Sequence, residues 1–373
     1  MTRKIRVLVV DDSVVIRRLL ADAISADSRF ELAAVAANGQ IALSVLERTQ
    51  PDVVTLDVEM PIMDGLETLK QIRAKHRSLP VIMFSTLTER CAQTTIDALA
   101  LGASDYVTKP ANVGSFSAAR QQVMDALIPK MLGLCRSPEP QECATTTPRM
   151  VTQSAPAVRL RKQTQTEAVE LVAIGSSTGG PNALAEVLRG LRADFPVPIV
   201  ITQHMPPAFT RFLAQRLNTY TPLEVKEAIA GVALEAGQVW IAPGDYHLCV
   251  VRDDRKVRLA LSTSAPENSC RPSVDTLFRS ISRAYKGSAV LAVVLTGMGQ
   301  DGLRGCELLA QTGAQIIVQD EASSVVWGMP GAVARAGLAS GILPQHLIAG
   351  ELVRRVSSSR SLNALLKRTA ALV

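Results

Sequence analysis

Val7-Leu-Val-Val-Asp-Asp12 is an apolar run that ends in two carboxylates. Further along the chain, Asp52-Val-Val-Thr-Leu-Asp57 is a second apolar run, which ends in one carboxylate, Asp57. Both runs are rich in β-branched residues with almost no polar interruption, which is typical of buried parallel strands. Because the carboxyl ends of parallel strands meet at one edge of an open α/β sheet, we expect Asp11, Asp12 and Asp57 to lie together there. Clustered carboxylates are the ligands that Mg²⁺ prefers, so the pattern predicts a magnesium site.

A lysine is expected at the same edge of the sheet. The pair Lys109-Pro110 follows a later apolar run, and the lysine amine supplies the positive charge that holds a phosphoryl group. We therefore interpret this edge as a site that carries a phosphoryl group on Asp57. Any one of these acidic residues taken alone would more simply be a solvated cap at a strand end.

Residues 1–125 resemble the receiver domain of two-component response regulators, and the matching motifs occur in the family's order. These motifs are Asp11-Asp12, Asp57-Val-Glu-Met-Pro-Ile-Met-Asp-Gly65, Pro80-Val-Ile-Met-Phe-Ser85 and Gly102-Ala-Ser-Asp-Tyr-Val-Thr-Lys-Pro110. The resemblance implies a doubly wound, flavodoxin-like parallel sheet whose site is loaded with phosphate.

The resemblance also implies a role for each residue of this site. Asp57 is the phosphoacceptor, Ser85 and Lys109 contact the phosphoryl oxygens, and Tyr106 is the switch aromatic. The implied Mg²⁺ ligands are Asp11, Asp12, Asp57 and the backbone carbonyl of Glu59. The Lys109-Pro110 bond is expected to be cis, which proline tolerates far better than other residues do.

The bulk composition is that of a globular protein with more than one domain. The chain has 373 residues, 47% of them hydrophobic, and a formal net charge of +6; this length predicts about two domains. Its apolar runs are too short for a membrane span or a signal-peptide core. The scattered positive charge argues against nucleic-acid binding. The cysteines have no metal-type spacing, which favours reduced thiols in the cytoplasm.

Changes in composition divide the chain into two folded parts. Residues 126–167 include a stretch rich in Thr, Gln, Pro and Ser, and we expect a flexible linker there. Strand-like runs separated by helical patterns predict a second doubly wound, Rossmann-like parallel sheet over residues 168–360. Two runs joined by a charged turn predict an antiparallel hairpin at residues 247–261. Residues 361–373 are expected to form a C-terminal tail.

Three strand ends of this second part carry reactive side chains. The first strand runs into Gly175-Ser-Ser-Thr-Gly-Gly180, where Ser177 fits a nucleophile-elbow pattern before a helix. The second strand leads to His204, which we favour as a base over the other histidines because it faces the same edge. A later strand runs into Thr296-Gly-Met-Gly-Gln-Asp-Gly302 and places Asp301 there. Serine, histidine and aspartate are the parts of a hydrolytic triad.

Two alternatives stay open from the residues alone. Gly- and Ser-rich loops before helices often cradle phosphates and present no nucleophile. In addition, Gly297-x-Gly299-x-x-Gly302 lies between a strand and a helix, and Asp320 ends the next strand, which matches a dinucleotide-binding fingerprint. Against an oxidoreductase, Asp301 would repel a pyrophosphate, and Ser177 and His204 would have no role.

Residues 168 to about 350 resemble the catalytic domain of the CheB family of chemotaxis protein-glutamate methylesterases. The matching motifs are Ala173-Ile-Gly-Ser-Ser-Thr-Gly-Gly180, Ile201-Thr-Gln-His-Met-Pro-Pro207, Ile241-Ala-Pro-Gly244, Leu295-Thr-Gly-Met-Gly-Gln-Asp-Gly302 and Gln319-Asp-Glu-Ala-Ser-Ser-Val-Val-Trp-Gly-Met-Pro330. The resemblance implies that Ser177, His204 and Asp301 form the triad. It also implies that the backbone amides of Thr178 and Met298 form the oxyanion hole.

This resemblance implies an activity and its partners as well. The expected reaction is hydrolysis of glutamate methyl esters on chemoreceptors with release of methanol, accompanied by deamidation of selected receptor glutamines, and the esterase domain is expected to need no cofactor. A chemotaxis histidine kinase is the expected phosphodonor. Phosphorylation of Asp57 is expected to relieve a receiver that covers the esterase. The expected location is the cytoplasm, at receptor clusters.

Overall fold

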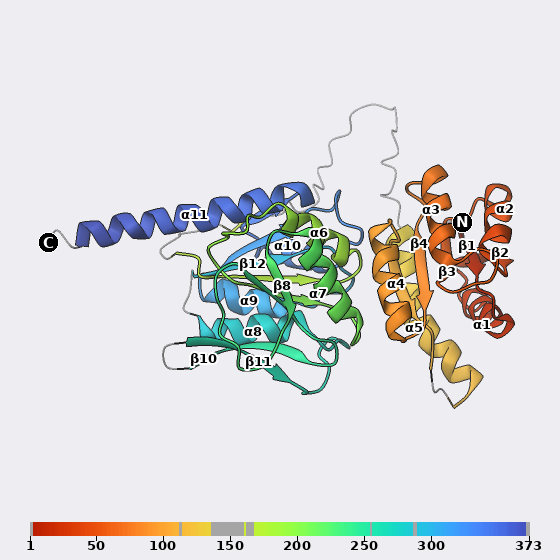
Figure 1. Ribbon diagram of the computed structural model, residues 1–373, viewed down its shortest axis with the longest axis horizontal. Helices are drawn as coiled ribbons and strands as arrows, with labels where there is room; N and C mark the ends of the chain where they lie inside the picture. The colour runs from red at the N-terminus through yellow and green to blue at the C-terminus, as the bar shows by residue number, and fades with distance from the viewer. Residues whose placement is uncertain are drawn as a thin grey trace, which may run out of the picture.

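The computed structural model describes residues 3–111, 114–135, 160–161, 168–253, 256–285 and 289–370, and the side chains of the last helix only as far as residue 358. Within these ranges the chain forms two α/β units that lie side by side (Figure 1). Most of the predicted linker, the tip of the predicted hairpin and the last three residues lie outside the described residues.

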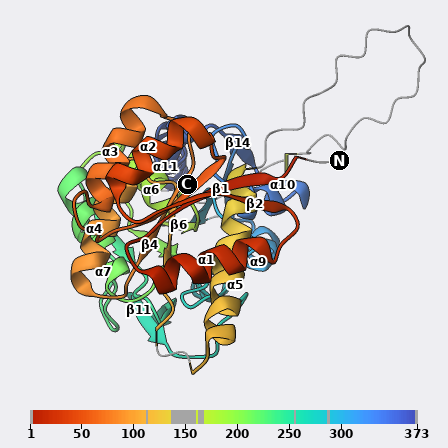
Figure 2. The same cartoon turned by 90° about the vertical axis from the view of Figure 1, so that its right-hand side faces the viewer.

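The first unit is a five-stranded parallel sheet in the order β2-β1-β3-β4-β5. Its strands are β1 (Ile5–Val10), β2 (Phe30–Ala36), β3 (Val53–Asp57), β4 (Val81–Ser85) and β5 (Asp105–Thr108). Its helices are α1 (Val14–Ser25), α2 (Gly39–Thr49), α3 (Gly65–Lys75), α4 (Glu89–Ala100) and α5 (Phe116–Cys135). Helices α1 and α5 lie on one face of the sheet, and α2, α3 and α4 on the other (Figure 2). This arrangement confirms the flavodoxin-like prediction.

The second unit is a seven-stranded parallel sheet in the order β14-β13-β12-β6-β7-β9-β8. Its strands are β6 (Leu171–Ser176), β7 (Ile199–Gln203), β8 (Glu224–Glu227), β9 (Gln238–Ile241), β12 (Val290–Val294), β13 (Gln315–Gln319) and β14 (Gly341–Leu343). Its helices are α6 (Gly180–Arg189), α7 (Phe209–Tyr220), α8 (Val274–Ala284), α9 (Leu303–Gln311), α10 (Met329–Arg335) and α11 (Gln345–Ala370). The predicted antiparallel hairpin is confirmed as β10 (His247–Asp253) paired with β11 (Lys256–Ser262).

Strand β6 lies at the point where the order of the second sheet reverses. The chain passes from β6 to β7 on one side and returns much later to β12 on the other side. The register pairs Ser176 with Gln203 and Gly175 with Val294. Because all three strands are parallel, the loops that follow β6, β7 and β12 open at the same carboxyl edge, where sheets of this kind place their sites.

The second sheet is buried on both faces, as all-parallel sheets usually are. One face packs against the leucines of α6 and α7, such as Leu184 and Leu213. The other face packs against α8, α9 and α10, with Phe278 of α8 fully buried. Because both faces of the sheet are buried, most residues of its strands are apolar. These apolar runs are the pattern from which the sheet was predicted.

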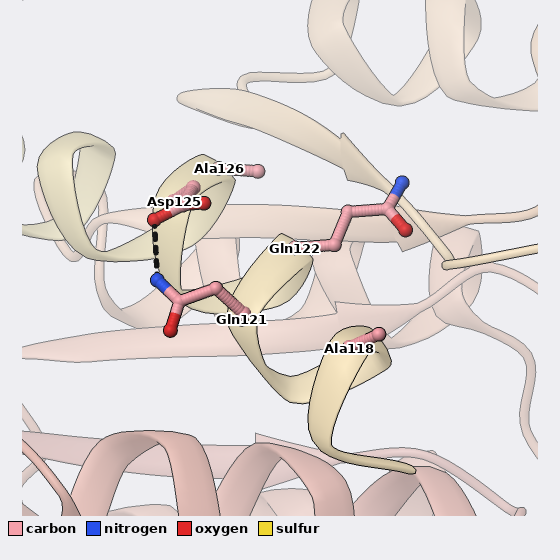
Figure 3. A pocket seen from close by; sticks show the side chains of 5 residues that line it. All are labelled: Ala118, Gln121, Gln122, Asp125 and Ala126. Carbon is pink, nitrogen blue, oxygen red and sulfur yellow. Dashed lines mark hydrogen bonds between the residues drawn. The ribbon is translucent and has the colours of Figure 1, made fainter. Parts of the chain in front are cut away.

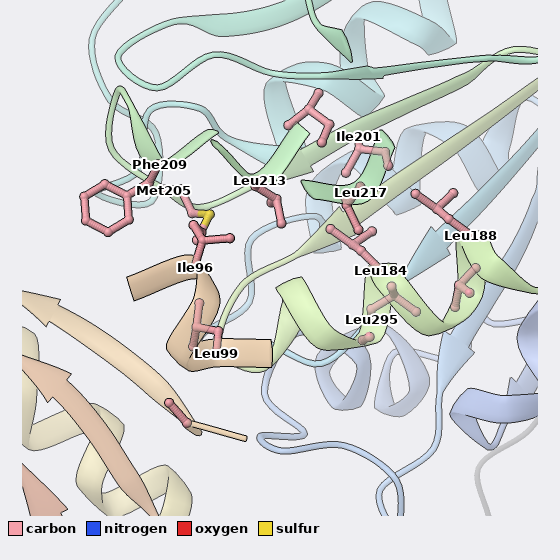
Figure 4. Close-up of a cluster of buried hydrophobic side chains, with 14 of the residues drawn as sticks. Ile96, Leu99, Leu184, Leu188, Ile201, Met205, Phe209, Leu213, Leu217 and Leu295 are labelled. Atoms are coloured by element: carbon pink, nitrogen blue, oxygen red, sulfur yellow. The ribbon is translucent and has the colours of Figure 1, made fainter. Parts of the chain in front are cut away.

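The two units contact each other through α4 of the first and α6 and α7 of the second. Apolar side chains form the centre of this contact, and Figure 4 shows Ile96 and Leu99 of α4 beside Met205. The contact is rimmed by an ion pair between Arg216 and Asp97, with 2.7 Å between nitrogen and oxygen. The loop that follows β7 thus touches the first unit directly.

Several expectations are revised by the structure. The Lys109-Pro110 bond is trans, so the expectation of a cis bond there is wrong; the only cis bond among the described residues is Arg271-Pro272. A trans bond is favoured before proline as well unless the surroundings impose cis. The expected domain boundary at residue 125 falls inside α5, because Leu127 and Met131 continue its buried face. The boundary at residue 360 likewise falls inside α11.

Two expectations from composition also meet the structure. None of the helices in the described part of the chain is long and apolar enough to cross a membrane. The cysteines at described positions carry no disulfide bond.

The packing on α8 gives a stability prediction. Replacement of Phe278 by alanine removes a fully buried ring and should lower the free energy of unfolding of the second unit by about 3–5 kcal/mol. Both tryptophans of the chain, Trp240 and Trp327, lie in this unit, so tryptophan fluorescence during urea unfolding reports on it alone. The exposed Ile229→Ala is the matched control and should change this free energy by less than about 0.5 kcal/mol. Equal losses in both variants would contradict the packing argument.

Candidate functional site

Three carboxylates meet at the carboxyl edge of the first sheet, as predicted. One oxygen from each of Asp11, Asp12 and Asp57 lies within 4.8 Å of the others. The Nζ atom of Lys109 lies 2.8 Å from an oxygen of Asp11 and 2.8 Å from an oxygen of Asp57. A compact set of carboxylate oxygens fits Mg²⁺, and the bound ion would screen the charge that a phosphoryl group brings to this site.

Burial sets the ionisation of this cluster. The pKa of Asp57 is raised to about 6, chiefly by burial and further by the charge of Asp11, although the hydrogen bond from Lys109 opposes the rise. Burial lowers the pKa of Lys109, but its contacts with the two carboxylates outweigh that effect and leave the pKa raised. The lysine therefore stays positively charged between two carboxylates.

The remaining residues expected at this site lie around it in different ways. Ser85 is fully buried and its hydroxyl accepts a hydrogen bond of 2.9 Å from Thr95 of α4, so it is directed toward that helix. Tyr106 is buried, and its ring stacks on Phe209 of the second unit with 4.8 Å between centroids and 11° between planes. The Glu59 side chain is exposed and pairs with Arg90, with 3.4 Å between nitrogen and oxygen.

Ser177 lies in the turn between β6 and α6. Gly179 in this turn has a φ of 77°, in the left-handed region that favours glycine, and a Cβ there would lie only 2.6 Å from Val325. Gly297 is equally constrained, because a Cβ on it would lie 2.9 Å from the Cβ of Ser177. The half-buried hydroxyl of Ser177 makes no hydrogen bond with any residue that the structure describes. The turn thus presents an unpaired hydroxyl at the sheet edge.

His204 follows β7 and meets Asp301 from the loop after β12. Its Nε2 atom lies 2.8 Å from Oδ2 of Asp301, and its Nδ1 atom lies 3.6 Å from the sulfur of Cys270. Within the described residues, no hydrogen bond joins His204 to Ser177, although their strands are paired up to the preceding residues. The structure therefore brings the histidine and aspartate into direct contact and places the serine on the adjacent strand end.

Asp301 is the most heavily hydrogen-bonded carboxylate of the site. It is buried and accepts hydrogen bonds from His204 Nε2, Asn268 Nδ2, Ser273 Oγ and the backbone amides of Val274, Asp275 and Gly302. Burial raises its pKa, but the hydrogen bond from His204 and the backbone amides outweigh burial, so the pKa lies below its ordinary value. The carboxylate is therefore ionised over the whole physiological pH range.

The sequence analysis did not identify Asn268, Ser273 or Cys270. They lie in the irregular segment between β11 and α8, which has no strand-end or helical period to mark them. A weak signal did exist, because asparagine tolerates the left-handed backbone, and Asn268 adopts a φ of 52°. This segment is held in turn by His247, whose Nδ1 accepts a hydrogen bond of 3.2 Å from the amide of Ser273. The other ring nitrogen of His247 lies 3.1 Å from the carbonyl oxygen of Ala265, so both of its nitrogens are used within this segment.

The protonation of His204 follows from the same contacts. Burial lowers its pKa, but the hydrogen bond with Asp301 and the contact with Cys270 outweigh burial and raise the pKa to about 9. A histidine acts as a general base only when it is neutral. In this resting arrangement, the imidazole is therefore protonated at neutral pH and becomes a competent base as the pH rises.

The two amides expected to form an oxyanion hole lie in the loops after β6 and β12. In the described part of the chain, the backbone amides of Thr178 and Met298 donate no hydrogen bond to the protein. The two loops are joined by Thr296, whose hydroxyl donates a hydrogen bond of 2.9 Å to the carbonyl of Thr178. Unpaired amides in loops held in place by this hydrogen bond could donate hydrogen bonds to a developing negative charge.

A cleft of about 330 Å³ opens beside His204 and is lined also by Asp245, Cys270 and Arg271. A second, shallow hollow runs along α5, where Gln121 donates a hydrogen bond to Asp125 (Figure 3). That hollow carries no chemically reactive cluster.

The dinucleotide-binding alternative is not supported by this geometry. The amide of Gly302 at the start of α9 donates a hydrogen bond of 3.1 Å to the side chain of Asp301, which occupies the position where a pyrophosphate would bind. Asp320 closes its own turn by accepting hydrogen bonds from Ser323. The glycines of this motif therefore serve the turn that carries Asp301.

The fold and the two sites define a response regulator with a hydrolase output unit. The family described as "Response regulator receiver domain" matches residues 7–120, and the family described as "CheB methylesterase" matches residues 172–352. The chain is 50% identical to a protein-glutamate methylesterase/protein-glutamine glutaminase of Trichodesmium erythraeum, over 95% of this chain and 99% of that one. A protein of the same description from Nocardioides sp. is also 50% identical, over 95% and 96% of the two chains.

Among solved structures, the chain is similar to the CheB methylesterase catalytic domain of Thermotoga maritima. The identity is 42% and the TM-score 0.49, and the match covers 50% of this chain and 98% of that one. Because the identity to whole curated relatives extends over almost the entire length, the chain belongs to the CheB family of protein-glutamate methylesterases with a receiver domain, and it is a hydrolase.

The pKa of His204 leads to a prediction about pH. Because the base must be neutral, kcat/KM for methanol release should rise with pH well beyond the ordinary histidine pKa, with a midpoint near 9. Cys270→Ala removes one of the contacts that raise this pKa and should move the midpoint to lower pH. The check is a pH profile of kcat/KM for both proteins between about pH 5.5 and 10, the span needed to bracket the limb. A wild-type midpoint near the ordinary histidine value would contradict the assigned protonation of His204.

Proposed function

We propose that this chain hydrolyses methyl esters of glutamate side chains on chemoreceptors, with Ser177 as nucleophile, His204 as general base and Asp301 as the group that orients the histidine. The observation that carries the proposal is the hydrogen bond of 2.8 Å between His204 and Asp301 at the strand end adjacent to Ser177. The names of the relatives point to the same reaction and to glutamine deamidation as a second one.

We assign each step to a particular atom. Nε2 of His204 carries a proton and donates it to the ionised Asp301, so Nδ1 is the nitrogen that can take the proton of the Ser177 hydroxyl. For this, the imidazole exchanges its contact with Cys270 for one with the serine. Catalytic hydrogen bonds of this kind often form only when substrate is bound.

The reaction then proceeds through an acyl-enzyme. The serine oxygen attacks the ester carbonyl, and the amides of Thr178 and Met298 stabilise the resulting oxyanion. His204 returns its proton to the leaving methoxide, and methanol departs. Water, activated by the same histidine, hydrolyses the acyl-enzyme to glutamate and restores the serine. A glutamine substrate follows the same course with ammonia as the leaving group.

The contact between the two units supports control of the esterase by the receiver. Asn182, in the first turn of α6 after the Ser177 loop, donates a hydrogen bond of 2.8 Å to the carbonyl of Leu99 in α4. Met205, directly after His204, is buried against the same helix (Figure 4). The helix after the Ser177 loop and the residue after His204 therefore both contact α4, and a shift of α4 would act on both.

The phosphoryl site is connected to this contact through two side chains. Ser85 is hydrogen-bonded to Thr95 of α4, and Tyr106 stacks on Phe209 of α7. We infer that a phosphoryl group on Asp57, with Mg²⁺ bound by the adjacent carboxylates, redirects Ser85 and Lys109 and loosens the contact. The phosphodonor is a chemotaxis histidine kinase, and the enzyme works in the cytoplasm at receptor clusters.

The nucleophile can be tested by a single substitution. Ser177→Ala should lower kcat for methanol release by several orders of magnitude, because it removes the attacking oxygen while alanine fits the same turn. Activity is measured as methanol released from methylated receptor, and tryptophan fluorescence checks that the variant is folded. The comparison variant is Ser176→Ala, whose hydroxyl is buried on Gln203. Loss of activity in Ser176→Ala with retention in Ser177→Ala would overturn the assignment.

The regulatory role of the receiver gives a separate prediction. Asp57→Asn should abolish the activation of methanol release by acetyl phosphate and Mg²⁺ and leave basal activity within about twofold, because Asp57 lies on a different sheet from the esterase residues. The measurement is the rate with and without phosphodonor at saturating receptor. Glu47→Gln, an exposed change in the same unit, should keep full activation. Activation that survives in Asp57→Asn would place the phosphoacceptor elsewhere.

A further inference from the structure

A second buried carboxylate lies behind Asp301. Asp275, in the first turn of α8, is 2% exposed, and its Oδ1 atom accepts a hydrogen bond of 2.7 Å from the amide of Gly305. Its Oδ2 atom accepts a hydrogen bond of 2.9 Å from Nδ2 of Asn268. The same Nδ2 donates at 2.8 Å to Oδ1 of Asp301. One amide group therefore joins two carboxylates that would otherwise repel each other.

The position of Asn268 is explained by its hydrogen bonds to the two carboxylates and not by packing in the core. Asn268 has a left-handed backbone conformation. The residue is also exposed, so it contributes nothing to the core. Its amide nevertheless points inward, and only the NH₂ end can donate to two carboxylates at once. A backbone conformation that costs free energy, at a residue without a packing role, is often associated with function.

We propose that Asn268 and Asp275 are positioning residues of the esterase: the Asn268 amide clamps Asp275 and Asp301 together, and this clamp fixes the direction in which Asp301 meets His204. The inference rests on the roles of His204 and Asp301 proposed above. In this proposal, Asn268 and Asp275 lie behind the triad and set both the orientation of Asp301 and the electrostatic field at the imidazole of His204.

The field at His204 is set by charged groups on several elements. Asp301 and Cys270 touch the imidazole directly, and Asp245 and Arg271 line the cleft beside it.

Further back, Asp275 lies on α8, and Glu267 is neutralised by an ion pair with Arg279. Burial raises the pKa of Asp275 to about 6, with Asp301 adding to the rise, so Asp275 is ionised where His204 loses its proton. A change of charge in the clamp must therefore move the titration of His204.

The pKa of His204 should shift in opposite directions in Asn268→Asp and Asp275→Asn. Asn268→Asp adds a negative charge beside Asp301, which stabilises the imidazolium and raises the pKa of His204. Asp275→Asn removes a negative charge and lowers that pKa. Asn268→Gly removes one donor from Asp301, which leaves the carboxylate more basic and raises the pKa of His204 by a smaller amount. Glycine also relieves the left-handed backbone at this position, so the loop should keep its shape.

The experiment is a pH profile of kcat and KM for methanol release from methylated receptor by the full chain with saturating acetyl phosphate and Mg²⁺. Relative to wild type, the midpoint of the acid limb should rise by about one pH unit in Asn268→Asp and by about half a unit in Asn268→Gly, and it should fall in Asp275→Asn. The kcat of Asn268→Gly should drop about tenfold with little change in KM, because Asp301 is less well oriented.

A charge swap and a neighbouring glycine serve as controls. The double variant Asn268→Asp/Asp275→Asn restores the net charge and a donor–acceptor pair, so its midpoint should return toward that of wild type. Ser269→Gly relieves the same kind of left-handed backbone one residue further on and should leave the midpoint unchanged. Tryptophan fluorescence checks the folding of each variant.

The outcomes separate this inference from the proposed catalytic roles. If His204→Gln keeps full activity, the proposed triad fails and the clamp fails with it. If His204→Gln is inactive but the midpoint is the same in every Asn268 and Asp275 variant, only the clamp is refuted. Shifts of the same sign in Asn268→Asp and Asp275→Asn would also refute it, since they would reflect general damage to the loop.

Discussion

The hydrogen bond between Asp301 and His204 depends on a buried negative charge, and much of the second unit is arranged to hold that charge. An ionised carboxylate out of water is costly unless donors surround it. Asp301 obtains its donors from the start of α8, the start of α9 and the irregular segment before α8. These three pieces are brought together only because β12 lies beside β6 in the sheet. The position of the aspartate thus depends on the strand order, and the state of the histidine depends on the aspartate.

The contact through α4 explains how one chain can couple two sites on separate sheets. Its apolar centre continues the core on one face of the second sheet, and its rim carries the Asp97–Arg216 ion pair. A partly exposed ion pair of this kind contributes little free energy. The apolar side chains therefore provide most of the affinity, while the ion pair favours one relative orientation. A contact of this composition can be loosened by a small movement of α4, as a switch requires.

Most of the site residues were predicted from their places at strand ends, which the order of the strands brings together. Asp57, Ser177 and His204 were proposed because each lies at or directly after the end of an apolar run, and Asp301 because it lies in the loop after another such run; parallel strands bring these positions to one edge. The expectation of a cis bond at Lys109-Pro110 was wrong, since the local sequence does not fix which isomer the surroundings select. The receiver boundary expected at residue 125 falls inside α5, whose buried face continues to Met131.

The sequence by itself determined the two parallel sheets, their order along the chain and the reactive residues at their edges. It could do so because strand periodicity and strand ends are local properties. The tertiary structure decided which nitrogen of His204 faces Asp301, that Cys270 lies against the other nitrogen, and that Asn268 joins Asp275 to Asp301. These contacts join residues far apart in the chain or within an irregular segment, where no period exists to predict them. They become definite only when the sheet order brings β12, α8 and β7 to one place.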